Sequence, residues 1–226
     1  MGNITNYNTQ VLINLQDNAT YISHTTDVNA QIKVAVESYS KDRPLRKVHK
    51  GTGDGTYSYS MPSDWVDGFS YATSMEYPGG EQIPAMLEDD AWMIYRDDTG
   101  LKIRFKDYTP GSTETFYMCY VIPHNVDDMH DTVSSCDFYA VCCLATAYCL
   151  MVMANKVQEE QESTIGADTI DRSSKAVEYK NKAKFWMDEY ERMLKRKDPE
   201  ASVSVKDFDT ELSTGEDYLT HPREGR

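Results

Sequence analysis

The stretch that decides the fold runs from Phe138 to Ala154 and reads FYAVCCLATAYCLMVMA. It holds 17 residues and no charged side chain. A membrane-spanning helix needs about 20 apolar residues, so this run is at the lower edge of that length. It also contains two tyrosines and a threonine and lacks the usual basic flank. We therefore predict a central helix that is buried on most sides by the rest of a soluble fold, and no membrane association.

Four of the five cysteines lie in or next to this run, at Cys136, Cys142, Cys143 and Cys149. Disulfide scaffolds spread their cysteines between loops, whereas cysteines inside one apolar run are typical of reduced, buried thiols. Adjacent cysteines also lack the C-x-x-C spacing of zinc and redox sites. The first ten residues carry no Lys or Arg and no long apolar run, so no secretory signal is expected and synthesis in a cytoplasm is predicted.

Helical periodicity continues on both sides of the run. On the N-terminal side, residues 7–18 carry apolar side chains at helical spacing, and Asp27 is placed to cap a second helix that stops before Pro44. On the C-terminal side, a long helix is predicted from about residue 171 to Lys197, where Pro199 follows. The positions expected to pack the helices together, within one chain or between subunits, are Leu144, Tyr148, Val152, Trp186, Tyr190 and Leu194.

The segment 51–122 has strand periodicity instead. Short runs that alternate apolar and polar residues are separated by turn residues such as Pro62 and Pro78. The runs 91–95 and 101–105 flank a short loop that contains Gly100, which predicts a β-hairpin. This part of the chain is expected to form a small antiparallel unit.

The predicted fold is therefore α+β and mainly α. We expect a bundle of about four helices with one long C-terminal helix, an inserted small antiparallel β unit and an extended C-terminal arm. The expected divisions are a helical core formed by residues 1–50 and 123–197, a β-rich insertion at 51–122, and an arm at 198–226.

The charge of the chain is negative and unevenly distributed. Lys and Arg number 23 against 37 Asp and Glu, which gives −14 and argues against a protein that binds nucleic acid through its phosphates. Segment 172–197 has nine basic and four acidic residues, whereas segment 198–226 has three basic and eight acidic ones. The latter has only scattered apolar residues, so it is predicted either to be disordered or to order against a partner, with Val203 and Val205 available for strand pairing.

The sequence contains no recognisable catalytic motif. The candidate for a metal site is segment 124–131, HNVDDMHD, whose members with suitable side chains are His124, Asp127, Asp128, His130 and Asp131. Its spacing matches no known metal loop, and such residues are common as helix caps and in solvated loops. We predict no catalytic residue, no metal site and no cofactor, and we keep a metal-dependent hydrolase built on this segment as an alternative.

Tyrosines in the strand region suggest one more alternative. Tyr57, Tyr59, Tyr71 and Tyr77 could line a face that binds carbohydrate. Tyrosine is also favoured in ordinary strands, and we expect packing to be its main role here.

The order of these pieces resembles the head–tail adaptor proteins, also called connector or head completion proteins, of long-tailed bacteriophages. The resemblance covers about residues 20–197. It lies in VLINLQD and ISHTTDVNAQIKVAVESYSKDRP near the N-terminus, in GDG, MPSDW and MEYPGG of the β-rich segment, in DFYAVCCLA, and in VEYKNKAKFWMDEY of the last helix. It is a pattern of apolar positions and turn residues, with no active-site signature.

The resemblance implies a structural protein of the virion neck, made in the host cytoplasm. Such adaptors form a ring of about twelve copies beneath the portal protein. They extend the channel through which DNA passes without specific binding, and they dock the next neck or tail-terminator protein. Another neck or tail-completion protein is an alternative within the same class. In the family the C-terminal segment reaches the portal, which implies a portal-binding arm carried here by Val203, Val205, Phe208, Leu212, Tyr218 and Leu219.

Overall fold

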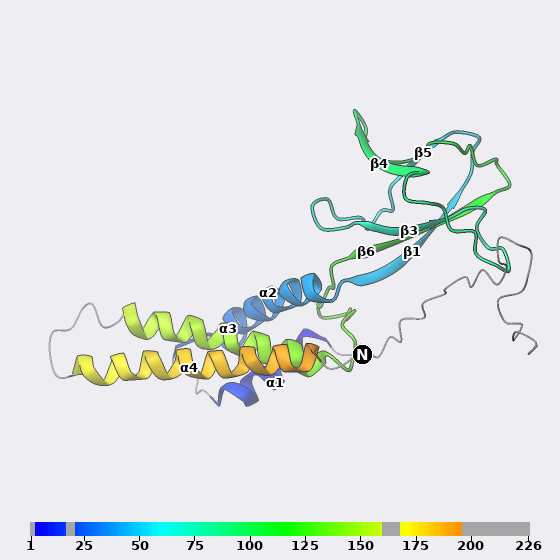
Figure 1. Ribbon diagram of the computed structural model, residues 1–226. Helices are drawn as coiled ribbons and strands as arrows, with labels where there is room; N and C mark the ends of the chain where they lie inside the picture. Colours follow the sequence, from blue (N-terminus) through cyan, green and yellow to red (C-terminus); the bar gives the residue numbers. More distant parts are fainter. Residues whose placement is uncertain (1–2, 17–20, 160–167, 196–226) are drawn as a thin grey trace, which may run out of the picture. The chain divides into compact units, whose positions relative to one another are not determined.

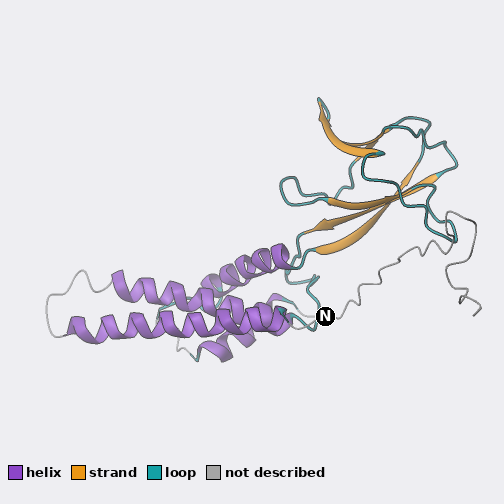
Figure 2. Ribbon diagram, viewed as in Figure 1, coloured by secondary structure: helices purple, strands orange, loops and turns teal. Residues whose placement is uncertain are grey.

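The computed structural model describes residues 3–16, 21–159 and 168–195 (Figure 1). These contain the helices α1 (Ile4–Leu15), α2 (Thr26–Asp42), α3 (Phe138–Glu159) and α4 (Asp168–Leu194). They also contain the strands β1 (Leu45–Thr52), β2 (Ser58–Ser60), β3 (Ala72–Glu76), β4 (Trp92–Asp97), β5 (Gly100–Phe105) and β6 (Thr115–Ile122). Every described strand lies between α2 and α3 in the chain (Figure 2).

The prediction of a mainly helical fold was wrong. In the described part of the chain, helices account for 41% of residues and strands for 22%, and the strands form two three-stranded antiparallel sheets, so the fold is a mixed one. The strand that the sequence pattern missed is β1, LRKVHKGT, which starts at Leu45, before the expected boundary at residue 51. This segment is basic and does not alternate apolar with polar residues. It is a strand because all eight of its residues pair with β6, a tertiary interaction that overrides local pattern.

The helices share one hydrophobic core with α3 at its centre. Residues 140–147 of α3 are all buried, and the helix packs against α1, α2 and α4. Thr146, the polar member of this run, donates its hydroxyl to the carbonyl of Cys142 at 2.7 Å. By length and composition α3 could cross a membrane, but 67% of its most apolar window is buried inside the protein. That burial is typical of a central core helix and fits the interpretation given to this run.

The two sheets enclose a second hydrophobic core. Their strand orders are β1-β6-β3 and β2-β5-β4. Alternate residues of β6, from Phe116 to Ile122, are buried, and the Phe116 ring lies 4.9 Å from that of Tyr59 and 5.2 Å from that of Phe105, centroid to centroid. The buried residues of this core and of the helical core form separate clusters. We refer to residues 45–122 as the β unit.

Gly51 of β1 is required by this second core. A Cβ on Gly51 would lie 2.0 Å from Cζ of Phe116, its partner across the sheet. Only a residue without a side chain therefore allows the Phe116 ring to cover β1.

Candidate functional site

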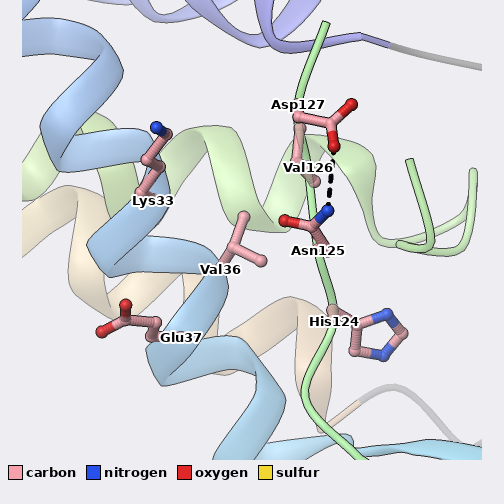
Figure 3. Close-up of a pocket in the computed structure, with 7 residues that line it drawn as sticks. All are labelled: Lys33, Val36, Glu37, His124, Asn125, Val126 and Asp127. Atoms are coloured by element: carbon pink, nitrogen blue, oxygen red, sulfur yellow. Dashed lines mark hydrogen bonds between the residues drawn. The ribbon is translucent and has the colours of Figure 1, made fainter. Parts of the chain in front are cut away.

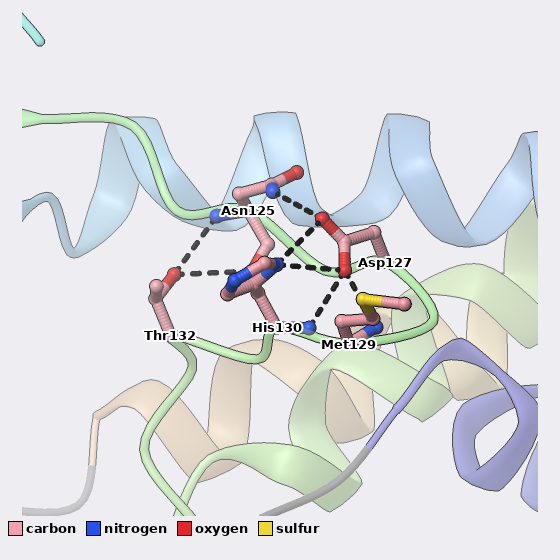
Figure 4. A network of polar contacts seen from close by, with 5 residues as sticks. All are labelled: Asn125, Asp127, Met129, His130 and Thr132. Carbon is pink, nitrogen blue, oxygen red and sulfur yellow. Dashed lines mark hydrogen bonds and ion pairs between the residues drawn. The ribbon is translucent and has the colours of Figure 1, made fainter.

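The candidate metal segment, residues 124–131, lies in the loop that returns the chain from β6 to α3. Asp127 organises this loop (Figure 4). Its Oδ1 accepts the backbone N–H groups of Met129 at 2.7 Å and His130 at 2.6 Å, and its Oδ2 accepts the Asn125 side-chain amide at 3.0 Å. The backbone bonds hold the pKa of Asp127 at about 2, because they stabilise the charged carboxylate. The carboxylate thus serves as the internal brace of a turn.

The ends of the loop are joined by a second set of bonds. Thr132 accepts the backbone N–H of Asn125 on its hydroxyl at 2.8 Å, and its own N–H donates to the Asn125 carbonyl at 3.1 Å. His124 Nδ1 lies 2.8 Å from the Thr132 carbonyl, which can only accept, so this nitrogen carries the proton. Burial lowers the pKa of His124 and favours its neutral form.

The loop is fastened to α1 and α2. The N–H of Ile4 donates to the Asp127 carbonyl at 3.1 Å, and the Tyr7 hydroxyl lies 3.2 Å from both carboxylate oxygens of Asp131. On α2, Ser40 Oγ accepts the N–H of His124 at 2.9 Å. Burial, and next the charge of Asp131, raise the pKa of Tyr7, so that its hydroxyl remains a donor.

The candidate metal ligands of the alternative hypothesis are therefore not gathered around one point. Within the described ranges no three His, Cys, Asp or Glu side chains come close enough to hold one ion. His130 and Asp127 do meet, with Nδ1 3.2 Å from Oδ1. Asp131 is instead directed to Tyr7, and His124 to Thr132. The loop and capping interpretation of this segment fits the geometry better than the metal hypothesis.

A pocket of about 200 Å³ lies between this loop and α2 (Figure 3). It is lined by Lys33, Val36, Glu37, His124, Asn125, Val126 and Asp127. The hydrogen bond drawn among these residues joins Asn125 to Asp127. A nucleophile hydrogen-bonded to a base, which covalent catalysis requires, is absent from this lining. The pocket is a polar hollow beside a structural loop.

A second polar network joins three helix ends at the place where the chain leaves for β1 and returns from β6. Asp137, just before α3, accepts from the Tyr39 hydroxyl at 2.7 Å and pairs with the Arg43 guanidinium at 2.9 Å. Arg43 also donates to the Leu194 carbonyl at the end of α4, at 3.0 Å. Tyr190 of α4 donates to Asp42 of α2 at 2.5 Å. This network escaped sequence reasoning, because its members are distant in the chain and form no motif.

The helix-packing positions chosen from the sequence all lie in the helical core. Leu144 and Tyr190 are buried there, and Tyr148, Val152, Trp186 and Leu194 pack against it. The arm positions Val203, Val205, Phe208, Leu212, Tyr218 and Leu219 lie outside the described residues.

The cysteines of the central run differ in exposure. Cys142, Cys143 and Cys149 are buried free thiols, and burial raises the pKa of Cys143 and of Cys149 to about 12. Cys136 is exposed, because it precedes the first turn of α3.

The tyrosines considered for carbohydrate binding also have different environments. Tyr59 is buried in the β core, and Tyr77 packs against that core and donates its hydroxyl to Glu114 at 2.7 Å. Tyr57 and Tyr71 are exposed. Strand packing thus accounts for two of the four, as expected of tyrosine in sheets.

In comparisons with known proteins, no protein-family model and no curated protein matches the sequence.

Proposed function

We propose that this chain is a structural protein of the neck of a tailed bacteriophage. In this proposal it forms a ring that joins the capsid portal to the next neck or tail protein and extends the channel for DNA. Its partners are the portal, further copies of itself and the next neck protein, and its place is the head–tail interface of the virion.

One observation carries the proposal. The resembling segments outside residues 45–122 overlap α1, α2, α3 and α4, and these helices share a single hydrophobic core. The additional segments of the resemblance, GDG, MPSDW and MEYPGG, all fall in the β unit, which is inserted between α2 and α3. The shared core of these helices and the insertion of the β unit between α2 and α3 support the proposal.

Surface properties add support. Val177 and Phe185 of α4 are apolar and more than half exposed, which is compatible with contacts to other protein surfaces in the proposed ring. The excess of acidic residues suits a channel wall that does not hold passing DNA by its phosphates.

The hydrolase alternative has no such observation in its favour. Its proposed ligands brace a loop, and no described pocket combines a nucleophile with a base. Another neck or tail-completion protein remains the competing proposal, because the resemblance alone separates it from an adaptor.

The direct test is electron microscopy and mass measurement of the purified full-length chain mixed with purified portal rings. We expect a ring of this protein at one end of each portal, with the stoichiometry given by the added mass. A chain that leaves portal rings unchanged would contradict the adaptor role. In electron microscopy of isolated phage particles, density for this protein only at the tail side of the neck would favour the tail-completion alternative.

A further inference from the structure

The sheet β2-β5-β4 has one face in the core and an opposite face on which Arg104 and Met93 are exposed. Ile103 and Phe105 of β5 are buried in the β core, so Lys102 and Arg104, which alternate with them, lie on the opposite face. Across the sheet, Arg104 is in register with Ser58 and Met93. We call this surface the Arg104 face and define it as Tyr57, Met93, Tyr95, Lys102 and Arg104.

The Arg104 face is ordered before any partner binds. The Arg104 guanidinium carbon lies 4.7 Å from the centroid of the Tyr57 ring and 5.7 Å from that of Tyr95. The Tyr95 hydroxyl is 2.7 Å from Ser58 Oγ, which fixes the ring. Stacked arginine loses little side-chain freedom on binding, and Tyr, Arg and Met are the residues enriched at the centres of protein interfaces.

A second surface of the β unit has complementary chemistry. Residues 81–90, EQIPAMLEDD, contain four acidic residues and no basic one. We call this segment the acidic loop. Two apolar side chains project from it, since Ile83 is 83% and Met86 is 60% exposed.

The backbone of the acidic loop is anchored although its side chains are exposed. Leu87 N–H donates to the Met75 carbonyl of β3 at 2.8 Å, and Tyr77 N–H donates to the Ala85 carbonyl at 2.9 Å. Within the part of the chain that the structure describes, none of the four acidic side chains forms a salt bridge, and neither do Lys102 and Arg104. Both surfaces thus carry charges of opposite sign that form no salt bridge among the described residues, next to exposed apolar groups.

We propose that the acidic loop of one copy of this chain docks on the Arg104 face of a second copy. Carboxylates of the loop pair with Arg104 and Lys102, while Ile83 and Met86 cover the rings of Tyr57 and Tyr95. The loop and the face are different surfaces, so around the proposed ring the contact repeats head-to-tail and each copy takes part in two of them. This inference rests on the proposed ring and names the β unit as a contact between its subunits.

The test is sedimentation equilibrium of the purified full-length protein at concentrations up to about 1 mM, where a contact of about 4 kcal/mol is half formed. Wild type is expected to self-associate. Arg104→Glu and the loop variant Asp89→Arg/Asp90→Arg are each expected to weaken association at least about tenfold, the usual range for a central charged contact. An equimolar mixture of the two variants is expected to associate again, because each reversed surface then meets a complementary one.

Lys50→Glu is the matched control. Lys50 lies on β1 of the other sheet, with its ammonium 5.8 Å from the centroid of the Tyr117 ring, so the charge change and the ring contact are similar. This variant is expected to associate as wild type does. Carbodiimide cross-linking of mixed ¹⁴N- and ¹⁵N-labelled protein is expected to join Lys102 of one copy to the acidic loop of another.

Several results would overturn the proposal. These are wild type that stays monomeric through the range, variants that associate like wild type, or a mixture that fails to recover. Cross-links between Lys102 and the loop that occur only within single copies would have the same effect. None of these results depends on the portal, so they leave the portal-binding test of the proposed function independent.

Discussion

Substitution of Gly51 by alanine is expected to destabilise the β unit through one identifiable collision. The added Cβ would lie 2.0 to 2.5 Å from three atoms of the Phe116 ring, far inside contact distance. The ring has little room to yield, because Tyr59 and Phe105 pack against it at 4.9 and 5.2 Å between centroids. Overpacking of this kind costs about 1–3 kcal/mol in the free energy of unfolding.

A double-mutant cycle with Phe116 distinguishes this collision from a general loss of stability. Phe116→Ala removes a fully buried ring and should cost about 3–5 kcal/mol by itself. In the double variant the new methyl group enters the space that the ring has left. The double variant should therefore lose about 1–3 kcal/mol less in free energy of unfolding than the sum of the losses of the two single variants.

Urea denaturation followed by tryptophan fluorescence can measure this cycle, since Trp65 and Trp92 pack against the β core. Gly111→Ala is the control: its Cβ would make only an ordinary contact, 3.4 Å from the Glu114 carboxylate, and its effect should stay within about 1 kcal/mol. Full additivity in the Gly51 and Phe116 cycle, or a Gly51→Ala variant as stable as wild type, would refute the packing argument.

Three further predictions concern the helical core, the loop and the arm. Tyr190→Phe removes the 2.5 Å hydrogen bond to Asp42 and should lower the free energy of unfolding by about 1–2 kcal/mol in urea titrations; an unchanged value would contradict a role for this bond. In an NMR pH titration Asp127 should protonate near pH 2 rather than near its ordinary 3.8; the loop stabilisation is then present above pH 3.8 and is lost as pH falls through about 2, and a midpoint near 3.8 would argue against the brace. Deletion of residues 198–226 should leave the helical circular dichroism signal per molecule and the melting temperature of the remainder nearly unchanged while abolishing portal binding, and retained binding would exclude the arm as the portal contact.

The sequence predicted the helices better than their ends. The uncharged run at 138–154 predicted α3 directly, because a run without charge is typical of a helix that is buried on most sides. Helix α2 begins at Thr26, although Asp27 was expected as its cap. Asp27 instead occupies the first turn, where its carboxylate accepts the N–H of Ser23 at 3.0 Å and pairs with Lys156 at 3.1 Å. An acidic side chain is favourable in either position, so composition alone could not separate them.

Strand β1 and the candidate site show why the remaining features could not be predicted. The strand state of β1 comes from pairing with a segment about seventy residues later, to which its own sequence gives no clue. In the loop 124–131, the residue types were compatible with a metal or with a turn. The segment forms a turn because the backbone N–H groups of Met129 and His130 donate to the Asp127 carboxylate. Hydrogen bonds of that kind cannot be predicted from residue identity.

A weak contact between β units would suit an assembly that forms only where it is needed. A head-to-tail contact strong enough to act alone would build rings or open chains in solution, away from the portal. A contact with a dissociation constant near 1 mM leaves dilute copies monomeric. If, as proposed, portal binding places copies side by side, their effective concentration would reach the millimolar range, where such a contact forms. The exposed, oppositely charged Arg104 face and acidic loop have the modest size and polarity that such a contact requires, whereas the large apolar surface of α3 is already buried within the chain.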